Sequence, residues 1–382
     1  MRRNDYYALE MLNGVPYLLP FGQNIASHKR GFKLNDTGVF LWNHLGEADN
    51  EEELVDLLLK DEELTIDEDK AIREDLKAFI DVLRSNGVIQ PDPLQLLPEV
   101  AKIRIAGVLV SIHGQTSYIS SAFDAFRVFD DNKADLTVNV ITGKKDINVG
   151  DRIVIRDKEI ELYESKTEWH MRFPTFDHIS FVSISKRLHY SEIFIRYEEE
   201  SALLREHLFH VLRHIFLLKA QSLGYFCIHS ASILYRGKAY LFSGPSGTGK
   251  STHTAFWKKQ YSVEYLNGDL NLISDEGTVY GIPWCGTSGI FTVKEYPLGG
   301  IVFLKQAKEN KVEELKGDEK SLRISQRLIS PSYNQELLEE NLSFSVNLGK
   351  QFPCWRLSCT KDPSAAELMK ETIDMLYRKV VL

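Results

Sequence analysis

The glycine-rich segment Gly244–Thr252 constrains the fold of this chain more than any other feature. It reads Gly-Pro-Ser-Gly-Thr-Gly-Lys-Ser-Thr, follows the apolar run Ala239–Phe242 and precedes a stretch of helical character. Its glycines allow backbone N–H groups to converge on phosphate oxygens, and the positive end of the following helix attracts the same anion. The order of strand, loop and helix argues against a chance match and predicts a P-loop that binds ATP and Mg²⁺.

The residues of this loop have separate expected roles. Lys250 is expected to reach the β- and γ-phosphates, and Ser251 to supply a hydroxyl to Mg²⁺. The predicted nucleotide-binding residues are Gly244, Ser246, Gly247, Thr248, Gly249, Lys250, Ser251 and Thr252. The loop predicts nucleotide binding but leaves the fate of the phosphate open.

Two polar residues on either side of the loop are candidates for the chemistry. His229 follows the apolar run Tyr225–Ile228, where we expect a strand to end, and Asp269 lies in the β-prone stretch after the predicted helix. A carboxylate at the end of a strand beside a P-loop is suited to bind metal or to accept a proton. We therefore predict His229, Lys250 and Asp269 as catalytic residues, and Ser251 and Asp269 as metal ligands. A buried, hydrogen-bonded histidine and a turn aspartate are the alternatives.

A glycine- and proline-bounded segment, Tyr280–Thr287, is expected to form a loop near this site. Residues 225–380 resemble the HPr kinase/phosphorylase-like family, relatives of the phosphoenolpyruvate carboxykinase nucleotide-binding fold. The matching segments are Ile228-His229-Ser230-Ala231, Gly244–Thr252, the strand with Asp269, Tyr280–Trp284, Tyr296-Pro297-Leu298 and Ile301–Leu304. The resemblance implies that the histidine and the aspartate lie beside the γ-phosphate. There one acid helps to remove the proton of a serine hydroxyl, and another binds the metal.

One position departs from this family pattern. Family members commonly have two adjacent acids in this strand, whereas Gly268 precedes Asp269 here. Either Asp269 alone serves as metal ligand or base, or Asp275 or Glu276 assists it. The departure bears on catalysis and leaves the prediction of nucleotide binding unchanged.

Residues 1–92 are predicted to form a small, winged-helix-like domain. Two β-prone runs, Tyr6–Leu12 and Val15–Leu19, flank Asn13-Gly14, which is typical of a two-residue hairpin turn. A third extended stretch is expected at residues 23–32. Three amphipathic helices should follow. The segment Leu34–Thr37 offers cap residues for the first, Asn50 should cap the second and Asp67 should open the third.

This region resembles the PqqD-like family, the peptide-recognition domains of pathways that modify ribosomally made peptides. The matching segments are Phe32–Gly38, Val39–Trp42 and Val82–Ile89. The resemblance implies capture of a precursor or leader peptide as an added strand on an exposed sheet edge, packed against a helix. The alternative is a module that only packs on the nucleotide-binding domain.

A linker and a β-rich region separate the two ends of the chain. Pro91, Pro93 and Pro98 mark the linker. Alternating apolar residues predict strands at Ile103–Ile112, Leu136–Ile141, Arg152–Ile155, Glu159–Tyr163 and Ile179–Ile184, and helical spacing predicts a helix at Glu199–Gly224. We therefore expect an α+β and α/β multidomain fold. Its parts are a winged-helix-like PqqD-type domain (1–92), a β-rich region (100–200) and a P-loop kinase core of the HPr kinase/phosphoenolpyruvate carboxykinase type (201–382).

The composition argues against several classes of partner. The net charge of −8 disfavours nucleic-acid binding, because neutralising phosphates requires surplus Lys and Arg. No apolar stretch follows Met1-Arg2-Arg3, and the apolar run Ile105–Ile112 is far shorter than the ~20 residues that span a bilayer. We therefore expect a cytoplasmic protein without a membrane partner. The four cysteines lack metal-site spacing and are expected to be buried free thiols.

These features favour an ATP-dependent kinase that phosphorylates a serine, or a threonine, hydroxyl on a precursor peptide held by its own amino-terminal domain. Three alternatives are left open. A kinase for free serine would not need the first domain. An ATPase would remodel or deliver a peptide without phosphorylating it, and a non-catalytic peptide chaperone would only bind nucleotide, an option that Gly268 supports. Homo-oligomer formation is also left open.

Overall fold

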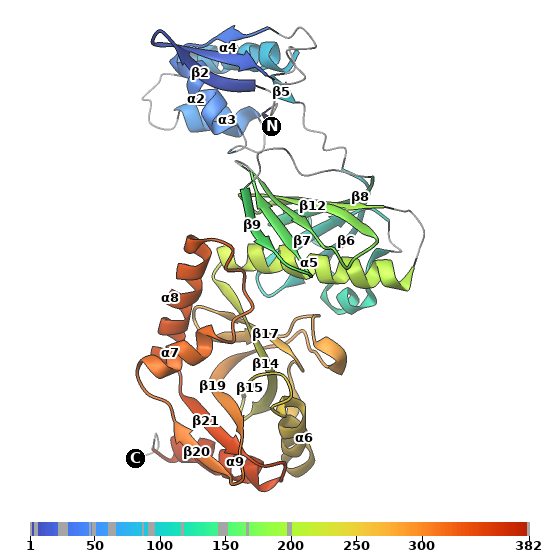
Figure 1. The fold of residues 1–382 in the computed structure, drawn as a ribbon, viewed down its shortest axis with the longest axis vertical. Helices are drawn as coiled ribbons and strands as arrows, with labels where there is room; N and C mark the ends of the chain where they lie inside the picture. Colours follow the sequence, from blue (N-terminus) through green and yellow to red (C-terminus); the bar gives the residue numbers. More distant parts are fainter. Residues whose placement is uncertain are drawn as a thin grey trace. The chain divides into compact units, whose positions relative to one another are not determined.

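The computed structural model describes residues 2–3, 7–21, 30–45, 47, 51–59, 66–85, 88–90, 96–115, 118–143, 152–165, 168–196 and 201–379. The chain divides into two compact units, Met1–Leu96 and Leu97–Leu382. Each unit has its own sheets and its own hydrophobic core, and Figure 1 shows the elements of both.

The first unit combines a small antiparallel sheet with three helices. Its sheet has the order β2-β3-β4, and two further short strands, β1 and β5, pair with each other. The strands are β1 (Arg2–Arg3), β2 (Tyr7–Leu12), β3 (Val15–Pro20), β4 (Phe32–Lys33) and β5 (Ile89–Gln90), and the helices are α2 (Asp36–His44), α3 (Glu51–Leu59) and α4 (Ile66–Ser85). Leu18 of β3, Leu41 of α2 and Ile80 of α4 are fully buried in one core that the sheet and the helices share.

The predicted hairpin and the three predicted helices of this unit are confirmed. Asn13 and Gly14 have φ angles of 52° and 78°, the left-handed values that a two-residue turn between twisted strands requires. The side chain of Asn35 caps α2 by accepting a hydrogen bond from the N–H of Gly38 at 2.8 Å. The third predicted strand falls mostly outside the described residues, and so does Asn50, the predicted cap of α3.

The second unit begins with an eight-stranded mixed sheet of order β6-β7-β8-β13-β12-β11-β10-β9. The pairs β7–β8 and β8–β13 are parallel, and the other pairs are antiparallel. The strands are β6 (Glu99–Ile105), β7 (Val108–His113), β8 (Leu136–Thr142), β9 (Arg152–Arg156), β10 (Glu161–Glu164), β11 (Glu168–Arg172), β12 (Ile179–Ser185) and β13 (Tyr190–Ile195), with the short 3-10 helix η2 (Ser121–Phe126) after β7.

Residues 100–200 are thus rich in strands, as predicted, but two details differ. The run Ile103–Ile112 forms a hairpin rather than one strand, because the chain reverses at Ala106, whose φ is 53°. Strands β11 and β13 are additional to those predicted. Each carries a buried polar residue, His170 and Glu192 respectively, which obscures the apolar alternation of the strand.

A second large sheet follows the long helix α5 (Ala202–Ser222). Its order is β15-β14-β17-β18-β19-β21-β20, with β16 paired to β14 and β15 paired also to β19. The strands are β14 (Tyr225–Tyr235), β15 (Lys238–Ser243), β16 (Glu264–Tyr265), β17 (Leu270–Ser274), β18 (Thr278–Tyr280), β19 (Glu295–Gln306), β20 (Lys311–Glu314) and β21 (Cys354–Cys359). Because β15, β19 and β21 are parallel neighbours, their carboxyl ends lie at one edge of the sheet.

Two pairs of helices cover the two faces of this sheet: α6 (Lys250–Tyr261) with α9 (Ser364–Lys379), and α7 (Asp318–Ser325) with α8 (Gln335–Gln351). Phe242 of β15 belongs to one core with Trp257 of α6 and Met369 of α9. Its neighbour Leu241 points to the opposite face and shares another core with Phe344 of α8. The alternation along β15 therefore places helices on both faces.

Helix α5 joins the two sheets of the second unit (Figure 1). Its apolar residues, among them Leu212, belong to one core with Val138 of the first sheet and Leu272 of the second. The regions predicted as separate domains, 100–200 and 201–382, therefore share a core within one compact unit.

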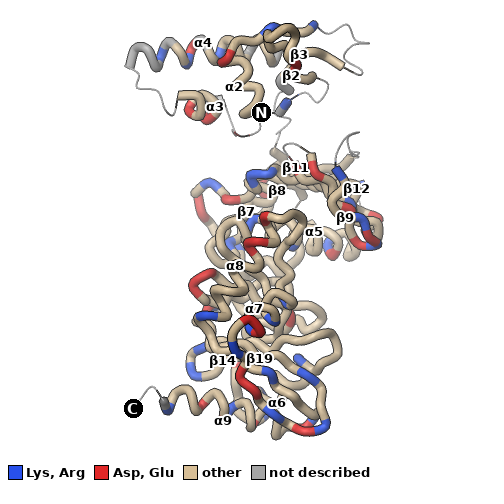
Figure 2. Tube along the Cα trace, turned by 60° about the vertical axis from the view of Figure 1, so that its left-hand side comes forward, with Lys and Arg blue, Asp and Glu red and all other residues tan. Residues whose placement is uncertain are grey.

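The distribution of the charged residues and the state of the cysteines can be compared with the predictions from composition. Basic and acidic residues are interspersed along both units in Figure 2. All four cysteines are buried and free, as predicted. Over the ranges that the structure describes, no helix has the length and apolar character needed to cross a membrane.

Candidate functional site

The predicted phosphate loop connects the end of β15 to the start of α6. Gly247 and Gly249 have φ angles of 78° and 98°, and the space where a Cβ would lie is open at both. Gly244 differs, because a Cβ there would lie 2.7 Å from the Oγ1 of Thr248. The glycines of the motif are therefore needed for two reasons, left-handed backbone conformation at two positions and close packing at the third.

Hydrogen bonds from three elements hold the loop in shape. Thr248 Oγ1 donates to the carbonyl of Pro245 at 2.7 Å. Gln306, at the end of β19, donates through Nε2 to the carbonyl of Gly247 at 2.9 Å. Ser243 Oγ donates to the carbonyl of His229 at 2.7 Å and so ties the start of the loop to β14.

Lys250 opens α6 directly below the loop. Its Nζ donates to the carbonyl of Gly244 at 3.3 Å, and burial lowers the pKa of this lysine while Asp269 acts in the opposite direction. Ser251 and Thr252 are exposed, and their hydroxyls make no hydrogen bond to the described residues. The ammonium and the two hydroxyls are thus in place to meet a ligand.

His229 lies in the middle of β14, whereas we expected a strand to end at Ile228. The strand runs on to Tyr235 without a break. It pairs with β17 up to His229 and with β15 from Ser230 onward. His229 therefore lies where the pairing with β17 ends and the pairing with β15 begins, and β15 leads into the predicted phosphate loop.

A buried polar network explains why β14 continues past its apolar run. Ser232 Oγ donates to Oδ1 of Asn271 at 2.6 Å, and Nδ2 of Asn271 donates to the carbonyl of Ser230 at 2.6 Å. All three residues are fully buried, so these bonds satisfy polar groups that would otherwise destabilise a central strand. The sequence analysis missed this network, although Ser230 and Ser232 show the two-residue spacing of one strand face.

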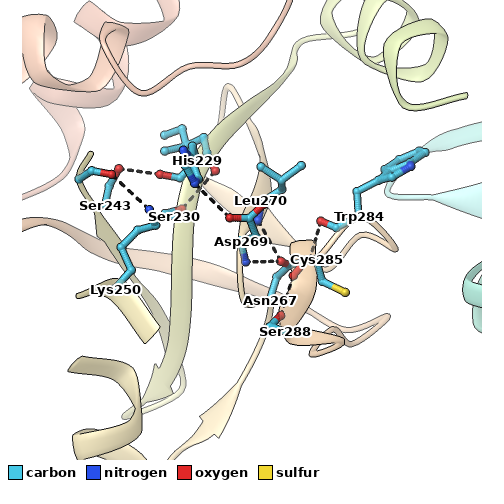
Figure 3. Close-up of polar contacts among 12 residues, drawn as sticks. His229, Ser230, Ser243, Lys250, Asn267, Asp269, Leu270, Trp284, Cys285 and Ser288 are labelled. Carbon is cyan, nitrogen blue, oxygen red and sulfur yellow. Dashed lines mark hydrogen bonds and ion pairs between the residues drawn. The ribbon is translucent and has the colours of Figure 1, made fainter. Parts of the chain in front are cut away.

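His229 and Asp269 face each other between β14 and the start of β17 (Figure 3). The distance from His229 Nε2 to Asp269 Oδ1 is 3.0 Å, and each side chain is about one-third exposed, 32% and 34%. This hydrogen bond is the main reason that the pKa of Asp269 lies below its ordinary value, and Lys250 and Arg213 lower it further. The structure thus brings the three predicted catalytic residues together around an ionised carboxylate.

Asn267 holds Asp269 in place. Its Oδ1 accepts hydrogen bonds from the N–H groups of Asp269 and Leu270 at 2.9 and 3.0 Å. Its Nδ2 donates to the carbonyl of Ile282 at 2.8 Å, so that the segment Tyr280–Thr287 lies beside the site, as expected. Asn267 is fully buried and was missed in the sequence analysis.

Gly268 occupies a position with no space for a second acid. A Cβ at this residue would overlap the Oγ and the Cβ of Ser288. Ser288 is fixed in turn, because its Oγ donates to the carbonyl of Cys285 at 2.6 Å. The departure from the two-acid pattern is therefore matched by the packing of the loop that faces it.

Asp275 and Glu276 follow the last residue of β17, at the opposite end of the strand from Asp269. Six residues at about 3.3 Å each place Asp275 roughly 20 Å away along the chain. Burial raises the pKa of Asp275, and Glu276 adds to this effect. Neither acid lies where it could assist Asp269. Among the residues that the structure describes, no three His, Cys, Asp or Glu side chains gather as a potential metal site.

A cationic cavity of 360 Å³ adjoins the outer half of the phosphate loop. It is lined by Pro245–Thr248, Phe303–Gln306, Arg323, Arg327 and Arg356. Arg356 is paired with Glu313 at 2.6 Å, whereas Arg327 forms no ion pair with the described residues. The backbone N–H of His229 donates to the carbonyl of Arg327 at 2.9 Å, which links this arginine to the histidine. The cavity is suited to the anionic part of a nucleotide.

The first unit contains a groove of 610 Å³ between the sheet edge and α4. It is lined by Lys33, Leu34, Asn35, Thr37, Ile72, Leu76 and Phe79. Strand β4 pairs with β3 on one side, and no described strand pairs with its other side. The groove thus combines a strand edge with an apolar helix face.

Comparison with known proteins identifies one part of the chain. Residues 25–89 match the sequence model of the family described as Coenzyme PQQ synthesis protein D (PqqD). The match includes β4, helices α2 to α4 and the residues that line the groove. No curated protein matches the chain. The PqqD-like domain is therefore supported, and the likeness of the P-loop region to HPr kinase stays a prediction.

Proposed function

We propose that the protein is an ATP-dependent kinase for a serine, or a threonine, hydroxyl on a precursor peptide held by its own first unit. The observation that carries the proposal is the His229–Asp269 pair, joined at 3.0 Å and placed next to the P-loop lysine. A carboxylate that a histidine orients, beside a phosphate loop, matches the requirements for accepting a hydroxyl proton during phosphoryl transfer.

In the proposed reaction the acceptor oxygen forms a bond to the γ-phosphorus of ATP. The bond from that phosphorus to the β–γ bridging oxygen breaks, and ADP leaves with the electron pair. The hydroxyl proton passes to the carboxylate of Asp269, which His229 orients through Oδ1. A carboxylate with a lowered pKa can still accept this proton, because the hydroxyl becomes more acidic as its oxygen bonds to phosphorus.

The residues around the loop also fit a divalent cation. Ser251 offers an exposed hydroxyl and Asp269 a partly exposed carboxylate, and oxygen ligands of this kind suit Mg²⁺. When bound, Mg²⁺ neutralises charge on the β- and γ-phosphates. Lys250 would lie at the same phosphates, and Gly247 and Gly249 would allow the backbone to approach them.

The first unit supports the choice of a peptide as acceptor. The PqqD match suggests a peptide-binding role of the kind found in the modification of ribosomally made peptides. An extended segment could add to the open edge of β4 and place alternate side chains in the groove on α4. Backbone hydrogen bonds would supply affinity without a diagnostic set of side chains.

The test is to incubate the full chain with Mg²⁺ and γ-labelled ATP together with candidate precursor peptides, and to measure label and intact mass on the peptide. We expect gain of one phosphoryl group on a serine or threonine, and no gain with Lys250→Ala. Hydrolysis of ATP without peptide labelling would favour the ATPase. Thermal stabilisation by ATP without turnover would favour the non-catalytic chaperone. The presence of a single acid, Asp269, also supports this alternative. Labelling of free serine in place of peptides would favour a small-molecule kinase.

A further inference from the structure

Arg213 lies on the face of α5 that points to the candidate active site. Phe209 and Phe216 on the same helix both contact the indole of Trp284, with ring centroids 5.8 and 5.1 Å apart. Positions 209, 213 and 216 follow the i, i+4, i+7 spacing of one helix face. Arg213 therefore lies between two residues that pack on Trp284, and Gly286, two residues after Trp284, adjoins Asp269.

The guanidinium of Arg213 has no counter-ion in the described part of the protein. The side chain is partly buried, and it forms no hydrogen bond or ion pair with any described residue. Burial lowers the pKa of Arg213. The charges of Asp269 and Glu159 raise this pKa, although neither carboxylate forms an ion pair with the guanidinium. Arginine stays charged in proteins, so a partly buried guanidinium without a counter-ion is suited to bind an anion. The chain supplies no such anion among its described residues, which points to a ligand.

The position of Arg213 relative to Asp269 separates it from the phosphate side of the site. Figure 3 shows Lys250 on one side of Asp269 and Trp284 on the other, and Trp284 is the residue that packs on the face of α5 with Arg213. The charge of Arg327 lowers the pKa of Lys250, whereas the charges of both Lys250 and Arg213 lower the pKa of Asp269. Arg327 lines the cavity at the loop, whereas Arg213 lies on the helix face that packs on Trp284, away from the loop.

We propose that Arg213 binds a carboxylate of the acceptor, so that the phosphorylated hydroxyl lies next to an acidic group in the substrate. This inference rests on the proposed kinase function and names its substrate class. A guanidinium binds a planar carboxylate through two parallel hydrogen bonds, and this geometry would place the neighbouring hydroxyl at Asp269. The carboxylate can come from an Asp or Glu side chain beside the acceptor serine, or from the α-carboxylate of a terminal serine.

The experiment uses the full chain and short serine peptides with both ends capped, which differ only by Asp or Asn at each position beside the serine. A third peptide has a free carboxyl terminus, and free L-serine is a fourth acceptor. We expect the wild type to favour carboxylate-bearing acceptors by on the order of 10–100-fold in kcat/KM, the effect of a hydrogen-bonded charge. The preferred acceptor distinguishes a side-chain from a terminal carboxylate.

Two variants and a control separate recognition from structural effects. Arg213→Gln should remove the preference, mainly through a higher KM for the acidic peptide, and should change KM for the neutral peptide far less. Arg213→Lys should restore part of the preference, since lysine carries the positive charge but lacks the two parallel N–H donors of the guanidinium. Lys219→Gln is the matched control, because Lys219 is a partly buried cation of the same helix whose charge acts with Asp135 instead. It should leave the preference intact.

A binding measurement keeps this inference distinct from the kinase proposal. With ADP and Mg²⁺ present, the Asp peptide should raise Tm of the wild type more than the Asn peptide, and Arg213→Gln should abolish the difference. If the wild type phosphorylates no acceptor but still shows this difference, the kinase proposal fails and the carboxylate site stands. If acidic and neutral peptides bind and react alike, or if Arg213→Gln lowers kcat equally for both, the carboxylate site is wrong.

Discussion

The P-loop edge of the second unit, meaning the predicted loop Gly244–Thr252 with His229 and Asp269, consists of side chains at fixed positions. The groove of the first unit consists instead of a strand edge and an apolar helix face. In the P-loop edge, His229 and Asp269 are partners in one hydrogen bond. Lys250 bonds to the loop and is expected to contact a phosphate. In the groove, most contacts with a peptide would come from the backbone of β4 and from interchangeable apolar residues such as Ile72 and Phe79.

This difference predicts unequal sensitivity to substitution. Phosphoryl transfer depends on the position and charge of a few groups, so a single change at the P-loop edge should have a large effect. Peptide capture by strand addition distributes its free energy over many backbone bonds, so removing the unit should be needed for a comparable loss.

The largest effect is expected from Lys250→Ala. The variant should lose the thermal stabilisation that Mg·ATP gives the wild type, together with all peptide labelling, because the ammonium that meets the phosphates is removed. Tm with and without nucleotide measures the first effect, and circular dichroism checks that the fold is retained. Stabilisation equal to that of the wild type would remove this loop as the nucleotide site.

Asp269→Asn should lower kcat by ~10²–10⁴-fold, the usual scale for loss of a general base, and leave ATP affinity close to that of the wild type. Initial rates at saturating ATP and peptide measure this change. A shift in the Mg²⁺ concentration needed for activity, rather than in kcat at saturating Mg²⁺, would instead make Asp269 mainly a metal ligand. Asp275→Asn is the matched control and should have no effect, because Asp275 lies at the other end of β17.

Separation of the two units at Leu96 should raise KM for a long precursor by on the order of 10²-fold, the lower end of what linking two binding events supplies. The remaining fragment should bind ATP normally, since the loop and its supports lie in the second unit. At saturating precursor the rates should converge, because the groups that act in the transition state are retained. Equal rates at every precursor concentration would show that the first unit does not capture the substrate.

The smallest effect concerns the response of the second unit to acid. Burial lowers the pKa of His253, on α6 against Phe242, to about 4. The unfolded chain binds this proton near pH 6.5 and the folded chain does not, so stability is lost as pH falls from about 6.5 towards 4. At pH 5 the loss from His253 amounts to about 2 kcal/mol. His253→Phe should therefore reduce the fall in Tm between pH 7 and pH 5, and an unchanged fall would contradict the assignment.

How far the sequence predicts the fold depends on how local each signal is. The Asn13-Gly14 turn, the Asn35 cap and the loop Gly244–Gly249 are decided by neighbouring residues, and the structure shows each where the pattern placed it. The continuation of β14 past Ile228 depends instead on hydrogen bonds between Ser232 and Asn271, residues that are distant in the chain. A local pattern cannot reveal such a partner, so the predicted strand ends earlier than β14 does.

The residues of the candidate site also differ in whether the sequence could predict them. Lys250 and Asp269 were predicted from motif order, because Lys250 follows β15 and Asp269 precedes β17, and His229 was predicted because it follows an apolar run. Asn267 and Arg213 were not, because their relevance comes from contacts with Ile282 and from the packing of α5 on Trp284. These contacts join elements that are far apart in the sequence, and no spacing rule relates them.

The contact between Gly268 and Ser288 makes the two positions mutationally interdependent. Introducing Asp at residue 268 should destabilise the wild-type chain, because its Cβ would overlap the serine side chain. The same substitution should be tolerated with Ser288→Gly, so the order of the two changes matters. A lineage carrying Ser288 could acquire a second acid at residue 268 only after that side chain became smaller. The single acid would thus persist through historical contingency, whether or not one carboxylate is the better arrangement for the reaction.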